Sequence, residues 1–103
     1  MSIHDVSTGL LVMSSRTNDE LVIHLVGELD MASWPRLVPL MDEPLNDDTV
    51  VFDLSGLTLL ASAGIAALLE VAQRWPDFRL RNPHRLILPI VRAAGLDRNV
   101  EFT

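Results

Sequence analysis

The sequence predicts one small α/β domain with a mixed, mostly parallel β-sheet. The chain has 103 residues, 49% of them apolar, which is enough for one core and one domain. Short runs rich in β-branched residues alternate with segments whose apolar residues recur at helical spacing. Only a polar turn separates the first two runs, so a hairpin precedes the alternating units. The expected order is β-β-α-β-α-β-α-β, with right-handed crossovers between parallel strands.

A β-hairpin is expected first. Residues 9–15 are apolar and suit an edge or second strand, and residues 16–19 are polar and suit a turn. Residues 20–26 are almost continuously apolar and rich in β-branched side chains, which favours a central strand. The segment Gly27-Glu28-Leu29-Asp30 is expected to end this strand and lead into a helix.

The first helix is expected over residues 33–43. Ser33 is suited to be its N-cap, and Pro35 falls in the first turn, where proline is tolerated. Pro39 lies further along, where a proline removes a backbone donor and clashes with the preceding turn. We therefore expect this helix to be short, kinked or broken near Pro39, and to be followed by an acidic loop over 44–48.

The second helical unit begins with a strand over residues 49–54. A short turn through Ser55 and Gly56 is expected next, and then a helix with Ser62 as its N-cap. Apolar residues at helical spacing mark the core face of that helix, namely Ile65, Leu68, Leu69, Ala72 and Trp75. Pro76 should end it.

The remaining elements follow the same alternation. Residues 78–81 alternate apolar and charged, which predicts a strand. A helix over 84–94 comes next, and because Pro89 interrupts it, it should bend or start late. Gly95 is suited to its C-terminal cap, and residues 100–102 suit a last short strand.

Composition excludes several classes of protein. The net charge of −6 argues against nucleic acid as a partner, and the absence of Cys excludes disulfides and thiolate metal sites. No apolar run approaches 18 residues and no signal peptide is recognisable, so we expect a cytoplasmic protein without membrane insertion. Residues 1–60 carry a charge of −8 and residues 61–103 a charge of +2. This asymmetry is either chance surface composition or an acidic partner face in the first half.

No catalytic arrangement is evident. His4, His24 and His84 stand in a terminus, a strand and a helix start, none within a recognisable motif. No Gly-rich loop suits a nucleotide phosphate, and paired acids occur only in loops and turns. We therefore expect a protein that is not an enzyme and holds no cofactor or metal of its own.

Ser62 is the residue most suited to regulation. A hydroxyl at a helix N-terminus lies where free backbone N–H groups and the helix dipole both favour negative charge. Phosphorylation there would act as a one-residue charge switch. The alternative is an ordinary N-cap that stabilises the helix by about 1 kcal/mol.

The segment around Ser62 resembles a family signature. Asp53-Leu54-Ser55-Gly56, a short apolar link and Ala61-Ser62-Ala63-Gly64 are similar to the signature of STAS domains, the family of bacterial anti-sigma factor antagonists. Three further segments resemble the family in the same order, namely Gly27-Glu28-Leu29-Asp30, Leu80-Arg81-Asn82-Pro83 and Ala94-Gly95-Leu96-Asp97. The resemblance extends from Asp19 to Phe102 and implies the small α/β fold of that family.

The resemblance also implies a function. The unphosphorylated protein would bind an anti-sigma factor of the serine kinase type and free a sigma factor for transcription. The kinase, which brings its own ATP and Mg²⁺, would phosphorylate Ser62 and end the interaction, because the added charge costs desolvation and repels nearby acids. The positions that match the family's signature and partner surface are Asp30, Asp53, Thr58, Ala61, Ser62 and Gly64.

Two of these positions have alternatives, and one departs from the family. Asp30 suits either the partner surface or a turn that caps the next helix, and Asp53 suits either repulsion of the phosphate or a turn toward Ser55. The family usually has an acid where this chain has Ala61, and often a second serine at Ala63. The site therefore either switches with altered kinase efficiency or binds without regulation. A STAS module of a transport or signalling-scaffold complex, and a small enzyme or ligand-binding domain of the same architecture, are the other functions considered.

Overall fold

The computed structural model describes residues 2–5, 9–17, 19–41, 49–75 and 77–102. Its elements in chain order are β1 (Ser2–Asp5), β2 (Leu10–Arg16), β3 (Glu20–Leu29), the 3₁₀-helix η1 (Trp34–Leu37), α1 (Val38–Met41), β4 (Thr49–Leu60), α2 (Ser62–Arg74), β5 (Phe78–Arg81), α3 (Leu88–Ala93), the 3₁₀-helix η2 (Asp97–Asn99) and β6 (Val100–Glu101). The predicted order of strands and helices is confirmed from β2 onward. Strand β1 is an addition that was not predicted.

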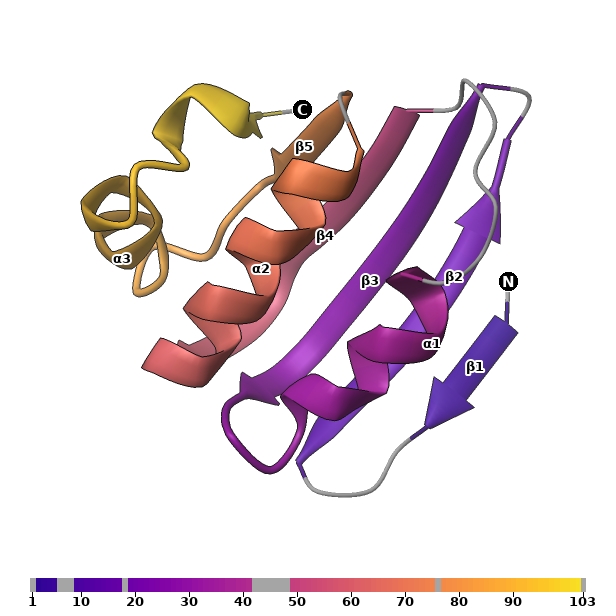
Figure 1. Cartoon of the computed structure of the whole chain (residues 1–103), viewed down its shortest axis with the longest axis horizontal. Coiled ribbons are helices and arrows are strands. Elements are labelled where there is room, and N and C mark those ends of the chain that lie inside the picture. The colour runs from indigo at the N-terminus through magenta and orange to yellow at the C-terminus, as the bar shows by residue number, and fades with distance from the viewer. Residues whose placement is uncertain (1, 6–8, 18, 42–48, 76, 103) are drawn as a thin grey trace.

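The six strands form one mixed sheet in the order β1-β2-β3-β4-β5-β6. Strands β1, β2 and β3 pair antiparallel, whereas β3, β4, β5 and β6 pair parallel. Figure 1 shows α1 and α2 lying across one face of this sheet and α3 beside β5. None of the helices in the described part of the chain is long and apolar enough to cross a membrane.

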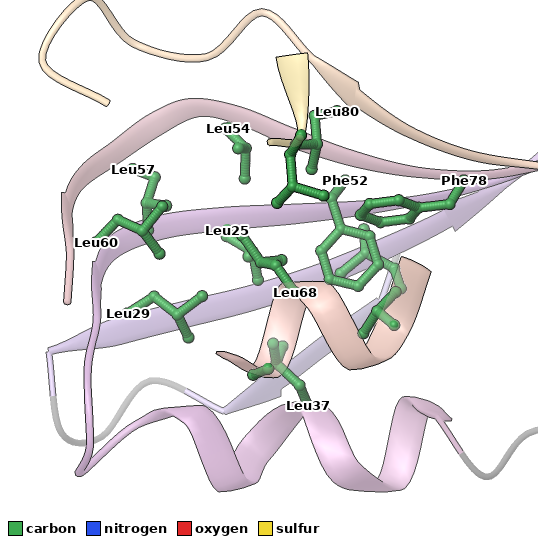
Figure 2. Close-up of a cluster of buried hydrophobic side chains, with 14 of the residues drawn as sticks. Leu25, Leu29, Leu37, Phe52, Leu54, Leu57, Leu60, Leu68, Phe78 and Leu80 are labelled. Carbon is green, nitrogen blue, oxygen red and sulfur yellow. The ribbon is translucent and has the colours of Figure 1, made fainter. Parts of the chain in front are cut away.

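The core fills the space between the sheet and these helices. Figure 2 shows the cluster, in which Leu37 from η1 and Leu68 from α2 meet side chains of the central strands. Phe52 and Phe78 are in edge-to-face contact, with ring centroids 5.6 Å apart. The largest fully buried side chains include Leu10, Ile23, Leu25, Leu29, Phe52, Leu54, Leu57 and Leu80. This dry layer anchors the helix that carries Ser62.

On the opposite face of the sheet, charged side chains form ion pairs across the strands. Arg81 on β5 contacts Glu20 of β3 at 3.0 Å and Glu101 of β6 at 2.7 Å. In the sheet register Arg81 lies opposite Asp53 of β4, and Glu20 lies opposite Thr49 of β4. The ion pair between Arg81 and Glu20 therefore crosses β4 over Val51, which lies midway between those two positions. Val51 is fully buried although the helices lie on the other face. The aliphatic stem of Arg81 can cover an apolar residue while its guanidinium stays hydrated.

Strand β4 is twice as long as predicted, and the expected turn at Ser55 and Gly56 is wrong. The pairing of β3 with β4 shifts between His24 and Val26 and again between Gly27 and Glu28, and each shift places one extra residue in β4. These shifts are β-bulges, which absorb a turn-like sequence without ending the strand. Strand β3 likewise continues to Leu29, so Gly27-Glu28-Leu29 belongs to the strand and the turn begins at Asp30.

The first helix is broken near Pro39, as that proline predicted. Residues 34–37 form a 3₁₀ turn and residues 38–41 a single α-helical turn, so the change falls just before Pro39. Residues 42 and 43 of the predicted helix, and its acidic loop, lie outside the described residues. Ser33 occupies the N-cap position, but its side chain makes no capping bond.

The last helix starts late, as expected. It begins at Leu88 with Pro89 in its first turn. Gly95, with φ +80°, follows the cap residue, and its N–H donates to Arg92 O at 3.0 Å, while Leu96 N–H donates to Val91 O at 3.1 Å. These two backbone hydrogen bonds form a Schellman motif, which confirms Gly95 as the residue that caps the C-terminus of the helix. The proline expected to end α2, Pro76, lies outside the described residues.

The hydrogen bond between Thr49 and Asp77 makes folding sensitive to acid. The Thr49 hydroxyl donates to Asp77 Oδ2 at 2.7 Å and lowers the pKa of Asp77 below its ordinary value, and nearby Arg79 acts in the same direction. A carboxyl whose pKa is lowered by folding stabilises the protein above its unfolded pKa, and this stabilisation is lost as pH falls through the folded pKa.

We therefore predict that Thr49→Val raises the pKa of Asp77 toward its ordinary value. Carboxyl-carbon NMR titration measures this pKa directly. The variant should also melt below the native protein at neutral pH, and this difference should shrink as pH falls through the folded pKa of Asp77. Thr58→Val removes a hydroxyl that bonds elsewhere and should leave the titration of Asp77 unchanged. An unchanged Asp77 pKa in Thr49→Val would contradict the prediction.

Candidate functional site

The candidate site is the junction at which β4 passes into α2. Strand β4 ends at Leu60, which pairs with Leu29 at the end of β3. Ala61 follows in extended conformation, with φ −87° and ψ 170°, and its N–H donates to Leu29 O at 3.0 Å. Helix α2 then begins at Ser62 without an intervening loop. The end of β3 therefore determines where Ser62 lies.

Ser62 is the first residue of α2 and is exposed. The N-cap is Ala61, so the prediction of Ser62 as N-cap is wrong by one residue. An alanine has no side-chain acceptor, no acidic residue lies in the first turn, and no side-chain capping bond is found. The first N–H groups of α2 are therefore left without the side-chain partner that Ser, Thr, Asp or Asn would supply.

Gly64 lets α2 approach the end of β3 closely. A Cβ added at this buried glycine would lie 2.7 Å from Leu29 O and 2.8 Å from Leu29 Cγ. Both distances are too short for ordinary packing, so only glycine fits without movement of the helix or the strand. Gly64 therefore positions Ser62 and is not itself available as an exposed contact.

Asp30 organises the turn between β3 and η1. Its Oδ1 accepts the N–H groups of Ala32 and Ser33, each at 3.0 Å. Its own N–H donates to the buried Ser33 hydroxyl at 3.0 Å, and that hydroxyl donates to Glu28 O at 2.8 Å. The alternative in which Asp30 caps the turn before the helix is thus confirmed. The turn begins one residue after Leu29 and so lies next to the start of α2.

Asp53 does not lie at a strand end and does not face the start of α2. It is in the middle of β4, between the core residues Phe52 and Leu54, and therefore points to the face without helices. There its Oδ2 lies 3.4 Å from His24 Nδ1, and its Oδ1 accepts the Ser55 N–H at 2.9 Å. The expectation that Asp53 repels a phosphate on Ser62 is wrong, and the alternative bond toward Ser55 is confirmed.

Thr58 lies on the exposed edge of the junction. Its hydroxyl donates to Gly27 O at 3.2 Å and so links the second bulge of β4 to β3. Gly27 has φ +111°, and a Cβ there would collide with the carbonyl oxygen of Gly9. Only glycine allows both the positive φ and the close approach to Gly9 at this position. The Gly27 carbonyl is thereby fixed as the acceptor for the Thr58 hydroxyl.

Two exposed apolar side chains belong to the segments that meet at the start of α2, and sequence reasoning did not single them out. Met31, in the Asp30 turn, is 75% exposed, and Leu59, just before the end of β4, is 40% exposed. A groove of about 200 Å³ beside α2 is lined by Trp34, Ala63, Ala66, Ala67 and Glu70. A large apolar residue in an otherwise polar turn was the available signal for Met31. The junction thus combines an exposed hydroxyl with apolar surface, which suits contact with another protein.

The described residues contain no group of three or more His, Asp or Glu side chains that could hold a metal ion. A larger open hollow of about 320 Å³ lies at the β5–β6 edge and is lined by Asp77, Phe78, Arg79, Arg98, Asn99, Val100 and Glu101. It shares no residue with the junction. The junction itself offers an exposed hydroxyl and exposed apolar side chains.

Comparison with known proteins places this geometry in a family. The family model described as "Mlab, STAS domain" matches residues 12–101. No curated protein matches the sequence. The fold is similar to an anti-sigma factor antagonist from Mycobacterium paratuberculosis, with a TM-score of 0.77, 20% identity and coverage of 94% of this chain and 87% of that one.

Two further solved structures share the fold. The anti-sigma factor antagonist SpoIIAA in its unphosphorylated form has a TM-score of 0.76 and 18% identity, with 89% of this chain and 87% of that one covered. The phosphorylated form of SpoIIAA, the Bacillus cell fate determinant, has a TM-score of 0.69 and 18% identity, with 89% and 90% covered.

The close approach at Gly64 predicts a large effect of a single methyl group. Gly64→Ala should destabilise the protein by about 1–3 kcal/mol, because the added Cβ overlaps the Leu29 carbonyl. Urea unfolding measures this loss. Ser62→Ala is the control at the same helix end and should change stability by less than about 0.5 kcal/mol, since its side chain makes no capping bond. Equal effects of the two substitutions would be evidence against the close approach.

The missing cap predicts a gain of stability. Ala61→Asp should raise the free energy of unfolding by about 1 kcal/mol, because the carboxylate can accept a first-turn N–H and lies at the positive end of the helix dipole. The gain should be present at pH 7 and decline as the carboxyl is protonated. Ala66→Asp, on an exposed position of the second turn, is the control and should show no comparable gain.

Proposed function

Since the chain belongs to the STAS domain family, we propose that it is a cytoplasmic anti-sigma factor antagonist regulated at Ser62. The unphosphorylated form binds an anti-sigma factor of the serine kinase type and thereby frees a sigma factor for transcription. The observation that carries this proposal is the exposed Ser62 hydroxyl at the first position of α2, at the junction where the exposed Met31 follows the end of β3 and the exposed Leu59 precedes the end of β4. Similarity in fold to anti-sigma factor antagonists supports it.

Binding in the unmodified state follows from the composition of the junction. Met31 and Leu59 offer apolar area that becomes buried when a partner docks, at about 25 cal/mol per Å². The neutral Ser62 hydroxyl costs little to bury if the partner supplies one hydrogen bond. The partner would thus cover Ser62 directly.

Phosphorylation reverses this balance. A phosphate adds about −1.5 to −2 charges at neutral pH, and covering it with an apolar partner surface carries a large desolvation penalty. The carboxylate of Asp30, held in the adjacent turn by its bonds to Ala32 and Ser33, adds to the negative charge at the junction. ATP and Mg²⁺ belong to the kinase, and this chain is its substrate.

Ala61 affects the modified state differently from an acid. An acid at the N-cap would occupy the first N–H groups of α2 and repel the phosphate. With Ala61 in that position, these N–H groups are left to stabilise a phosphate on Ser62. Phosphorylation therefore weakens partner binding without unfolding the helix, so the switch acts on the contact surface.

A STAS module of a transport or signalling-scaffold complex is the second candidate. The family model is described by the name Mlab, and Ala61 and Ala63 stand where antagonists usually have an acid and a second serine. In such a complex the same apolar surface would bind a subunit permanently, and Ser62 would remain unmodified.

The proposal is tested with purified protein and the kinase-type anti-sigma factor of the source organism. We expect this kinase, supplied with ATP and Mg²⁺, to transfer one phosphate to Ser62, and mass spectrometry to locate the phosphate there. Ser62→Asp should weaken binding about tenfold to hundredfold, or about 1.4–2.8 kcal/mol, as measured by calorimetry.

Thr17→Asp is the matched control for added charge. Thr17 is exposed beside the start of β3, and the opposite end of that strand contacts Ala61. The Thr17→Asp variant should bind the anti-sigma factor with the same affinity as the native chain. Equal binding by the native chain and by Ser62→Asp would favour the scaffold module, and no binding by the native chain would exclude the antagonist function.

A further inference from the structure

The segment from His84 to Ala94 has one buried and one exposed face. Leu88 N–H donates to His84 O and Val91 N–H to Ile87 O, each at 3.0 Å, so helical bonding begins before the regular helix α3. Ile87 and Val91 are buried in the core. The exposed residues lie on the other side, and we call them the outer face of α3: Arg85, Leu86, Pro89, Arg92 and Ala93.

Two arginines of this face have no partner among the described residues. Arg85 and Arg92 are exposed, and neither forms a hydrogen bond or an ion pair there. Arg79 and Arg81, by contrast, each contact two carboxylates. Within the described part of the chain, the outer face therefore carries two positive charges without a paired carboxylate, although the net charge of the protein is −6.

The spacing of these charges suits a helical partner. Seven residues separate Arg85 from Arg92, which corresponds to two turns or about 10 Å along a helix. Leu86, which is 59% exposed, lies between them together with Pro89. A helix that presents two carboxylates two turns apart, with an apolar side chain between them, would match both the charges and the apolar centre.

Other occupants fit less well. A membrane-binding helix needs several large apolar side chains, whereas the outer face offers Leu86 alone, and the net charge opposes anionic lipid. Nucleic acid needs more cations than two. A second copy would have to supply an acidic helix, and in the described part of the chain α2 contains only Glu70 as an acid.

We propose that the outer face of α3 is a second docking surface, which binds an acidic helix of the partner that also engages Ser62. This inference rests on the proposed function for the identity of the partner. His84 N–H donates to Leu54 O at 3.4 Å, so the segment is tied to the same strand, β4, that leads to Ser62. In this proposal one partner spans both surfaces, and the outer face contributes affinity that phosphorylation does not remove.

The test reverses both charges and compares two variants of equal net charge. Arg85→Glu with Arg92→Glu alters the outer face, and Arg74→Glu with Arg98→Glu alters two exposed arginines elsewhere. The probe is the purified kinase-type anti-sigma factor, and calorimetry at about 50 and 200 mM salt gives Kd. Circular dichroism and Tm verify that both variants fold.

We expect the outer-face variant to bind about tenfold to hundredfold more weakly, with a smaller salt dependence of Kd than the native chain. The control variant should lose less than about threefold. Reversing an acidic pair on a partner helix to arginine should restore binding to the outer-face variant. That rescue distinguishes a direct contact from a general effect of charge.

Several outcomes would overturn the inference. Equal losses of affinity in the outer-face variant and the control variant would show that only net charge matters, not the outer face. Retained affinity in the outer-face variant, with binding still lost in Ser62→Asp, would remove the second surface and leave the proposed function intact. No binding by the native chain would remove both. Binding of the native chain to phosphatidylcholine–phosphatidylglycerol vesicles or to duplex DNA, lost only in the outer-face variant, would replace the protein partner and so overturn it.

Discussion

The contact between the end of β3 and the start of α2 is the constraint on which the rest of the site depends. Leu29 O accepts the Ala61 N–H and lies so close to Gly64 that no Cβ fits between them. Backbone therefore meets backbone, and the relative position of strand and helix does not depend on flexible side chains. The Asp30 turn follows Leu29 directly, so this single contact also places that turn next to the start of α2. The ends of β3 and β4 and the start of α2 are thereby held in one arrangement.

Different groups cover the apolar residues on the two faces of the sheet. Under α1 and α2, interlocking leucines and the Phe52–Phe78 pair exclude water. On the other face Arg81 crosses β4 and joins carboxylates from β3 and β6 above Val51. Such ion pairs contribute less than an apolar core, yet they leave a charged surface that is soluble and resists association. The helix side and the outer face of α3 remain as the surfaces suited to a partner.

Sequence reasoning located most elements because strong local signals marked them. The apolar run of β3, the two prolines of the first helix and Gly95 each specify backbone geometry directly. It failed in the second half of β4, where Ser55 and Gly56 indicated a turn and Leu54, Leu57 and Leu60 recur every three residues, unlike a regular strand. Within the site it found Ser62 and Gly64 but placed the cap one residue late and Asp53 on the wrong face. The exposure of Met31, Leu59 and Arg92 depends on how distant segments pack, which no local pattern encodes.

The two bulges of β4 have a consequence for how this chain can change in length. In a regular strand, side chains alternate between faces, so Leu54 and Leu57 would point to opposite sides. Each bulge shifts the alternation by one position, and together they bring Leu54, Leu57 and Leu60 into the same core. Loss or gain of one residue between Asp53 and Ala61 would turn part of this row toward solvent and rotate α2 about its entry point. The number of residues in this short stretch is therefore fixed more strictly than their identity: an apolar substitution of similar size leaves each side chain on its face, whereas an insertion or deletion moves later side chains to the other face.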